Sequence, residues 1–174
     1  MSKKRIALDM DGVLADVYEQ YFKMDEADFG KKRPFDEIAG VKESASFPNV
    51  RKYLYQSGFF RGALVMDGCQ NVVNQLNDQY DLFIVSAAME FPLSLSEKKE
   101  WLAEHFPAIS WQQIVFCGTK TIINADIMID DHFKNLDAFP GQTILFTQPH
   151  NMKMDAGRHT RANSWKELGS MLLQ

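Results

Sequence analysis

Five short apolar runs, separated by longer stretches of polar and helical sequence, restrict the fold more than any other feature of this chain. The runs are Ile6–Leu8, Leu82–Val85, Ile114–Phe116, Ile127–Ile129 and Thr143–Phe146. After Asp67-Gly68, the residues Val72, Val73 and Leu76 have the spacing of a buried helix face. Strands that alternate with helices are typical of a parallel sheet with crossover helices. We therefore predict an α/β fold with a Rossmann-like parallel sheet.

Two sequences have the pattern of a capping box, in which a serine begins a helix and a glutamate follows three residues later. Ser94-Leu95-Ser96-Glu97 predicts the start of a helix that carries Trp101. Ser164-Trp165-Lys166-Glu167 predicts the start of a last helix that continues through Leu172.

The segment after the first strand is too long for an ordinary connection between a strand and a helix, which has about 2–6 residues. It is rich in aromatic residues, and Pro34, Gly40, Pro48 and Gly58 divide it into short pieces. We expect residues 17–64 to form a small helical cap, and residues 1–16 and 65–174 to form the α/β core. Inserted after the first strand, the cap would lie over the edge of the sheet at which Asp9 lies.

The composition excludes several classes of protein. A net charge of −4 argues against a general nucleic-acid binder, which needs a basic face. Cys69 and Cys117 lack a Cys-x-x-Cys partner, so neither a zinc site nor a disulfide framework is indicated. The apolar run between Arg5 and Asp9 is too short for the hydrophobic region of a signal peptide. No run has the length of a membrane span. We expect a cytoplasmic protein that contacts neither membrane nor nucleic acid.

Asp9-Met10-Asp11-Gly12-Val13 follows directly on the first apolar run. Ligands of open parallel sheets bind at the carboxyl ends of the strands. An aspartate there can attack phosphorus as a nucleophile, and a second one can move protons. The sequence could also be a polar turn that caps the next helix. A calcium-binding EF-hand loop is excluded, because Val13, Leu14 and Gln20 stand where that loop needs a polar ligand, a glycine and a glutamate.

Polar residues follow three later strands in the same way. Ser86 ends the second run, Lys120 comes shortly after the third, and Asp130-Asp131 follow the fourth. Singly, each has an ordinary structural explanation as a cap, a solvated lysine or a turn. Together on one sheet edge they fit phosphate chemistry, with Ser86 and Lys120 contacting phosphoryl oxygens. Oxygens of Asp9, of the Asp11 backbone and of one member of the Asp130-Asp131 pair could bind Mg²⁺.

These four motifs, in this order, resemble those of the haloacid dehalogenase-like (HAD) phosphatases. The resemblance implies that Asp9 is the nucleophile, that Asp11 is the general acid/base and that Mg²⁺ is the cofactor. It also implies that Asp131 contacts the metal directly and that Asp130 is a supporting residue beside Lys120.

Within this superfamily the chain looks most like the 5′(3′)-deoxyribonucleotidases. The similarity lies in Asp9–Asp16, in Lys120–Asp131 and in Gly58-Phe59-Phe60, which resembles a stretch that lines their base pocket. It implies a small-molecule nucleotide substrate, with Phe59 or Phe60 against the base. Val17 and Arg61 depart from the mammalian enzymes, so the preferred base stays open.

Three alternatives differ in what the same residues would do. The first is a HAD phosphatase for another small phosphate monoester, such as a sugar phosphate or phosphoglycolate. The second is a receiver-type signalling phosphoacceptor, which the position of Lys120 before the acidic pair disfavours. The third is a catalytically silent binding module, which is disfavoured because no catalytic position is missing.

Overall fold

A six-stranded parallel sheet forms the centre of the molecule in the computed structural model, which describes residues 3–173. The order is β5-β4-β1-β6-β7-β8, and every neighbouring pair is parallel. The strands are β1 (Arg5–Leu8), β4 (Asp81–Ser86), β5 (Ile114–Phe116), β6 (Ile127–Asp130), β7 (Gln142–Phe146) and β8 (Thr160–Ala162). The predicted α/β fold and its five strands are confirmed. The edge strand β8 was not predicted, because Thr160-Arg161-Ala162 is neither an apolar run nor rich in β-branched residues.

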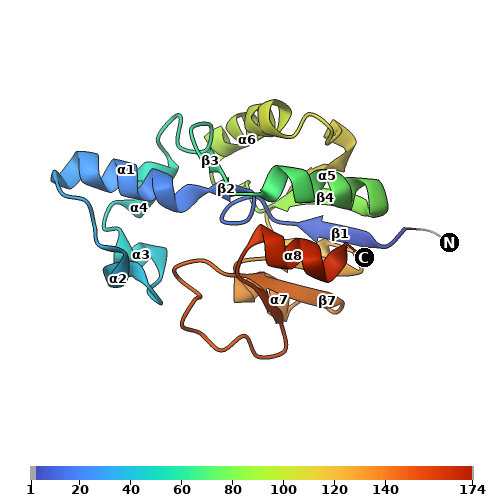
Figure 1. Ribbon diagram of the computed structural model, residues 1–174. Helices are drawn as coiled ribbons and strands as arrows, with labels where there is room; N and C mark the ends of the chain where they lie inside the picture. The colour runs from blue at the N-terminus through green and yellow to red at the C-terminus, as the bar shows by residue number, and fades with distance from the viewer. Residues whose placement is uncertain (1–2, 174) are drawn as a thin grey trace.

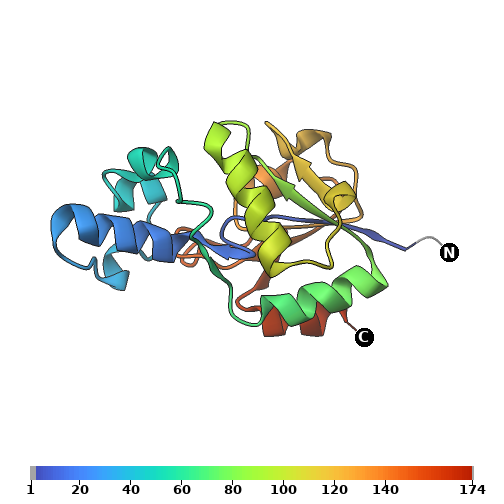
Figure 2. The ribbon, with the colours of Figure 1, turned by 90° about the horizontal axis from the view of Figure 1, so that it is seen from above.

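Helices cover both faces of this sheet. Alternate strand residues point to opposite faces, so Ile6 and Leu8 join one hydrophobic cluster and Ala7 joins the other. The first cluster packs against α5 (Cys69–Gln79), α6 (Pro92–His105) and α8 (Trp165–Leu172), and the second against α7 (Phe133–Asp137). Figure 2 shows α5 and α8 side by side. Among residues 3–173, no helix is both long enough and apolar enough to cross a membrane.

The long segment after β1 forms a separate group of short helices that extends to one side of the sheet (Figure 1). They are α1 (Val17–Phe29), α2 (Phe35–Ile38), α3 (Glu43–Ser46) and α4 (Val50–Leu54). Tyr21 lies at their centre, with its ring centroid 5.2 Å from that of Phe47 and 5.1 Å from that of Phe59. We call residues 17–63 the helical lobe.

Two short strands connect the helical lobe to the rest of the chain. They are β2 (Ala15–Asp16) and β3 (Leu64–Val65), which pair antiparallel so that Asp16 lies opposite Leu64. The Asp16 side chain also caps α1 by accepting a hydrogen bond from the Glu19 N–H. We call this pair of strands the neck.

The two predicted capping boxes have different outcomes. Ser164 caps α8 by accepting from the Glu167 N–H, although the Glu167 carboxylate bonds the Asn163 N–H instead of completing the box. The box predicted at Ser94 is wrong, because α6 begins at Pro92 and Ser94 Oγ donates to the Ala88 carbonyl. Two 3₁₀ turns, η1 (Trp111–Gln113) and η2 (Lys120–Ile122), flank β5.

Candidate active site

The carboxyl ends of the central strands bring the predicted site residues together. Asp9 follows β1, Ser86 ends β4, and Asp130 ends β6 with Asp131 directly after it. Lys120 reaches the same edge from η2. All five are buried.

Asp9 has one fixed carboxylate oxygen and one free one. The Met10 N–H and the Lys120 ammonium both lie 2.7 Å from Oδ1. Within residues 3–173, no group donates a hydrogen bond to Oδ2, and Asp9 lines the cavity described below. Burial, together with repulsion from Asp130, raises the pKa of Asp9 to about 8. Oδ2 is therefore the oxygen available for reaction.

The turn after Asp9 needs a glycine. Gly12 has φ +72°, a conformation that side chains disfavour, and a Cβ there would collide with Oδ2 of Asp131. Gln148 fixes this turn from the loop after β7 by donating to the Gly12 carbonyl. The first and fourth motifs can approach each other this closely because position 12 has no side chain.

Asp130 is fully paired. Its Oδ2 lies 2.6 Å from the Lys120 ammonium, the Asn135 amide donates to both oxygens, and the His132 N–H donates to Oδ1. Burial alone would raise the pKa of Asp130, but Lys120 and these hydrogen bonds hold it below its usual range. Likewise, burial alone would lower the pKa of Lys120, but Asp9 and Asp130 together raise it. Asp130 therefore positions Lys120, and both of its carboxylate oxygens already accept hydrogen bonds.

Asp131 is the opposite case. It is 3% exposed, and its buried Oδ1 has no hydrogen-bond partner within the described part of the chain. Burial and the neighbouring Asp130 raise the pKa of Asp131 to about 8. Oxygens of Asp9, Asp130 and Asp131 lie within 4.8 Å of one another. Because Asp130 is already paired, the unsatisfied Oδ1 of Asp131, with the Asp9 carboxylate beside it, fits a hard divalent cation.

A buried lysine completes the site, and the sequence analysis did not predict it. Lys98 of α6 is 1% exposed, and its ammonium lies 2.5 Å from Oδ2 of Asp11 and 2.9 Å from Oγ of Ser86. The same ammonium lies 4.5 Å from the centre of the Phe60 ring. Oδ1 of Asp11 is buried and has no hydrogen-bond partner among residues 3–173. Lys98 therefore orients one oxygen of Asp11 and leaves the other free.

Glu97, next to Lys98, ties α6 to the helical lobe. Its carboxylate accepts hydrogen bonds from the N–H groups of Gly58, Phe60 and Arg61. The glutamate that the sequence assigned to a capping box thus fixes the turn that carries Phe60.

A cavity of about 400 Å³ opens over these groups. Its charged end is lined by the predicted site residues Asp9, Asp11, Ser86, Lys120 and Asp131. Its apolar wall is lined by Val17, Tyr21, Val50, Leu54, Phe60 and Phe91. Phe60 therefore contacts the cavity. Phe59 does not line it, because its ring packs against Tyr21 in the centre of the lobe.

Comparisons with known proteins identify the family of this chain. Residues 3–174 match the family described as 5′ nucleotidase, deoxy (pyrimidine), cytosolic type C protein. A Staphylococcus epidermidis protein, provisionally named 5′(3′)-deoxyribonucleotidase, is 41% identical over an alignment of 174 positions. The alignment covers 97% of this chain and 95% of that protein. The Bacillus subtilis 5′(3′)-deoxyribonucleotidase is 39% identical, with 98% of this chain and 99% of that protein covered.

Solved structures show the fold. D,D-heptose 1,7-bisphosphate phosphatase from Burkholderia thailandensis has a TM-score of 0.61 at 12% identity, with 99% of both chains covered. A haloacid dehalogenase-like hydrolase from Xanthomonas campestris has a TM-score of 0.58 at 13% identity. With a HAD-type fold, acidic motifs at the strand ends and a family match over almost its whole length, the chain belongs to the type C 5′ nucleotidases, a family of HAD-like phosphatases.

Proposed function

We propose that this enzyme is a Mg²⁺-dependent phosphomonoesterase that dephosphorylates deoxyribonucleoside and ribonucleoside monophosphates through an aspartyl-phosphate on Asp9. The observation that carries this proposal is the free Oδ2 of Asp9 at the charged end of the cavity, beside the buried Lys120 ammonium.

In the first step, Oδ2 of Asp9 attacks phosphorus and the bond from phosphorus to the ester oxygen breaks. The leaving oxygen takes a proton from Asp11, whose Oδ1 accepts no hydrogen bond from the described residues. Lys98 holds the Asp11 carboxylate in place through Oδ2. Lys120 and Ser86 stabilise the phosphoryl oxygens as negative charge develops on them.

In the second step, water attacks the phosphorus of the aspartyl-phosphate and gives up a proton to Asp11. The bond between phosphorus and Oδ2 breaks, so inorganic phosphate leaves and the Asp9 carboxylate is restored. Asp11 thus returns to the protonation state that the first step needs.

The donor set favours Mg²⁺ as the cofactor. Asp9, Asp131 and the backbone carbonyl of Asp11 would hold the ion, while Asp130 supports Lys120. When bound, Mg²⁺ offsets the repulsion between a phosphate dianion and this acidic site.

The apolar wall of the cavity and the names of the relatives support a nucleotide as the substrate. Residues 17–64 act as a cap over Asp9, and Phe60 contributes a ring face for a nucleobase. The cavity's combination of a charged end and an aromatic wall matches a phosphate joined to a flat base.

A substrate panel tests this proposal. Phosphate release would be measured with deoxyribonucleoside and ribonucleoside monophosphates, a sugar phosphate and phosphoglycolate, each with Mg²⁺ and with EDTA. We expect the nucleotides to be the best substrates and EDTA to abolish turnover. A preference for the sugar phosphate or phosphoglycolate would contradict the nucleotide assignment, and full activity in EDTA would contradict the metal.

A further inference from the structure

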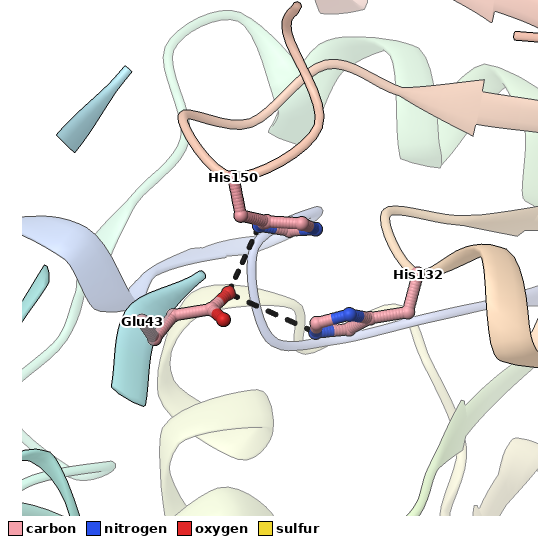
Figure 3. Close-up of side chains that lie close together, drawn as sticks. All are labelled: Glu43, His132 and His150. Carbon is pink, nitrogen blue, oxygen red and sulfur yellow. Dashed lines mark ion pairs between the residues drawn. The ribbon is translucent and has the colours of Figure 1, made fainter. Parts of the chain in front are cut away.

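Glu43 of the helical lobe contacts two histidines of the α/β core (Figure 3). Glu43 begins α3, His132 follows β6, and His150 lies in the loop after β7. Oε1 of Glu43 lies 2.9 Å from Nδ1 of His150 and 4.0 Å from Nε2 of His132. The Tyr18 hydroxyl, in α1, donates to the same Oε1 and lies 3.0 Å from the same Nδ1. These contacts join the lobe to the core.

A second metal site is the obvious alternative for a glutamate and two histidines, and the ring geometry disfavours it. An imidazole binds a metal through a lone pair in the plane of its ring. The rings of His132 and His150 are 17° from parallel, with centroids 4.4 Å apart. Their in-plane lone pairs therefore run side by side and do not converge on one point. The cluster is better described as a hydrogen-bonded contact.

The second ring nitrogen of His150 contacts the backbone of Asp131. Nε2 of His150 lies 2.9 Å from the backbone oxygen of Asp131, to which it can donate. The Asn151 amide donates to the same oxygen, also at 2.9 Å. Arg161 holds the loop after β7, which carries His150, in place by donating to oxygens of Asn151 and Met154. His150 therefore has one ring nitrogen on the lobe and the other on Asp131.

The contact between lobe and loop extends beyond His150. The Gly40 N–H, between α2 and α3, donates to the Pro149 carbonyl at 2.7 Å. The Lys153 side chain packs so closely over Gly40 that a Cβ there would touch it. The Glu97 carboxylate, in contrast, joins the lobe to α6 and makes no hydrogen bond to the Asp131 loop.

We propose that His150 is a positioning residue that couples docking of the helical lobe to the placement of Asp131. With the lobe docked, Glu43 and Tyr18 orient the imidazole, and the imidazole fixes the backbone that carries the metal-binding carboxylate. This inference rests on the proposed function, because it takes Asp131 as a metal ligand.

A double-mutant cycle between Tyr18 and His150 tests the coupling. Tyr18→Phe removes only a hydroxyl, changes no charge, and affects a residue that does not line the cavity. His150→Gln keeps one amide donor for the Asp131 oxygen and presents no second nitrogen to Glu43. The readout is Mn²⁺ binding by electron paramagnetic resonance, without substrate, because Mn²⁺ accepts the same oxygen ligands as Mg²⁺.

We expect Tyr18→Phe to raise the Mn²⁺ dissociation constant by about two- to tenfold, the worth of one hydrogen bond, when His150 is present. In the His150→Gln background the same change should raise it by less than a factor of about 1.5. Glu26→Gln, at an exposed position of α1, is the control for the lobe and should leave the constant unchanged.

Two results would overturn the coupling. One is an equal effect of Tyr18→Phe in both backgrounds; the other is no effect in either, with melting temperatures showing that the variants are folded. If the wild type hydrolyses nucleotides and binds Mn²⁺, such a result refutes only the role of His150. Failure of the wild type to bind Mn²⁺ would refute the metal assignment in the proposed function as well.

Discussion

Replacing Asp131 with asparagine should make the metal-free protein more stable at alkaline pH. The pKa of Asp131 is raised from 3.8 to about 8 by burial and by Asp130. Because the folded-state pKa lies above the unfolded one, the stability linked to this proton is fully present below about pH 4. It is lost as the pH rises through about 8, when a buried carboxylate without a counter-ion must carry its charge. Asparagine has a similar shape and carries no such charge.

The size of the effect follows from the two pKa values. Between pH 6 and pH 8, a carboxyl with a pKa of about 8 in the folded state loses about 2 kcal/mol of stability relative to the unfolded chain. For a protein of this size, that corresponds to about 4 to 8 °C in melting temperature. Asp131 is also one cause of the raised pKa of Asp9, so its replacement relieves Asp9 in the same direction. In EDTA, the difference in melting temperature between Asp131→Asn and wild type should therefore increase by this amount, in favour of the variant, between pH 6 and pH 8.

Thermal unfolding in EDTA at several pH values measures this difference, and the same scans with millimolar Mg²⁺ provide the counterpart. Mg²⁺ should restore the wild type at pH 8 by binding only the folded state, and should do less for the variant. The reasoning is refuted if the difference between the two proteins is the same at pH 6 and pH 8. It is also refuted if Mg²⁺ stabilises both proteins equally.

Three further substitutions test the reaction itself. Asp9→Asn should lower turnover more than about a thousandfold in a protein that still folds, because an amide forms no aspartyl-phosphate; a smaller loss in a steady-state assay would exclude Asp9 as the nucleophile. Lys98→Met should slow the chemical step by about 10²–10⁴ by releasing the carboxylate of Asp11, and single-turnover kinetics that match wild type would exclude this role. Phe60→Ala should reduce activity on deoxynucleoside monophosphates far more than on para-nitrophenyl phosphate; a parallel loss, with a lower melting temperature, would make Phe60 a core residue only.

The sequence was sufficient for five of the six strands of the sheet and for the polar residues that follow them. Apolar runs such as Ile6–Leu8 fix the strands, and parallel strands place the residues that follow them at one edge. Asp9, Lys120 and Asp130 could be grouped before their contacts were known for this reason. The edge strand at Thr160–Ala162 escaped because its pairing with β7 does not depend on an apolar pattern.

Lys98, Glu97 and His150 could not be assigned, because their local sequence does not indicate which distant residues they contact. Lys98 lies within a helix, where a lysine is ordinarily solvated, and its partner Asp11 is 87 positions away. Glu97 has the spacing of a capping box, yet the amides it accepts from lie 36 to 39 positions away in the lobe. His150 lies in the loop after β7, but its contacts to Glu43 and Tyr18 form only when the lobe and core meet. Local spacing contains no information on such pairs.

The neck has a consequence for how enzymes of this architecture diversify. The helical lobe enters and leaves through two strands that pair with each other, with Asp16 opposite Leu64. The ends of the insertion are therefore neighbours, and their hydrogen bonds depend little on what lies between them. Insertions, deletions or an exchanged lobe at this point leave Asp9 and Asp11, which precede the neck, at the end of β1. New substrates can thus be acquired by recombination at one junction, without evolving the chemistry again.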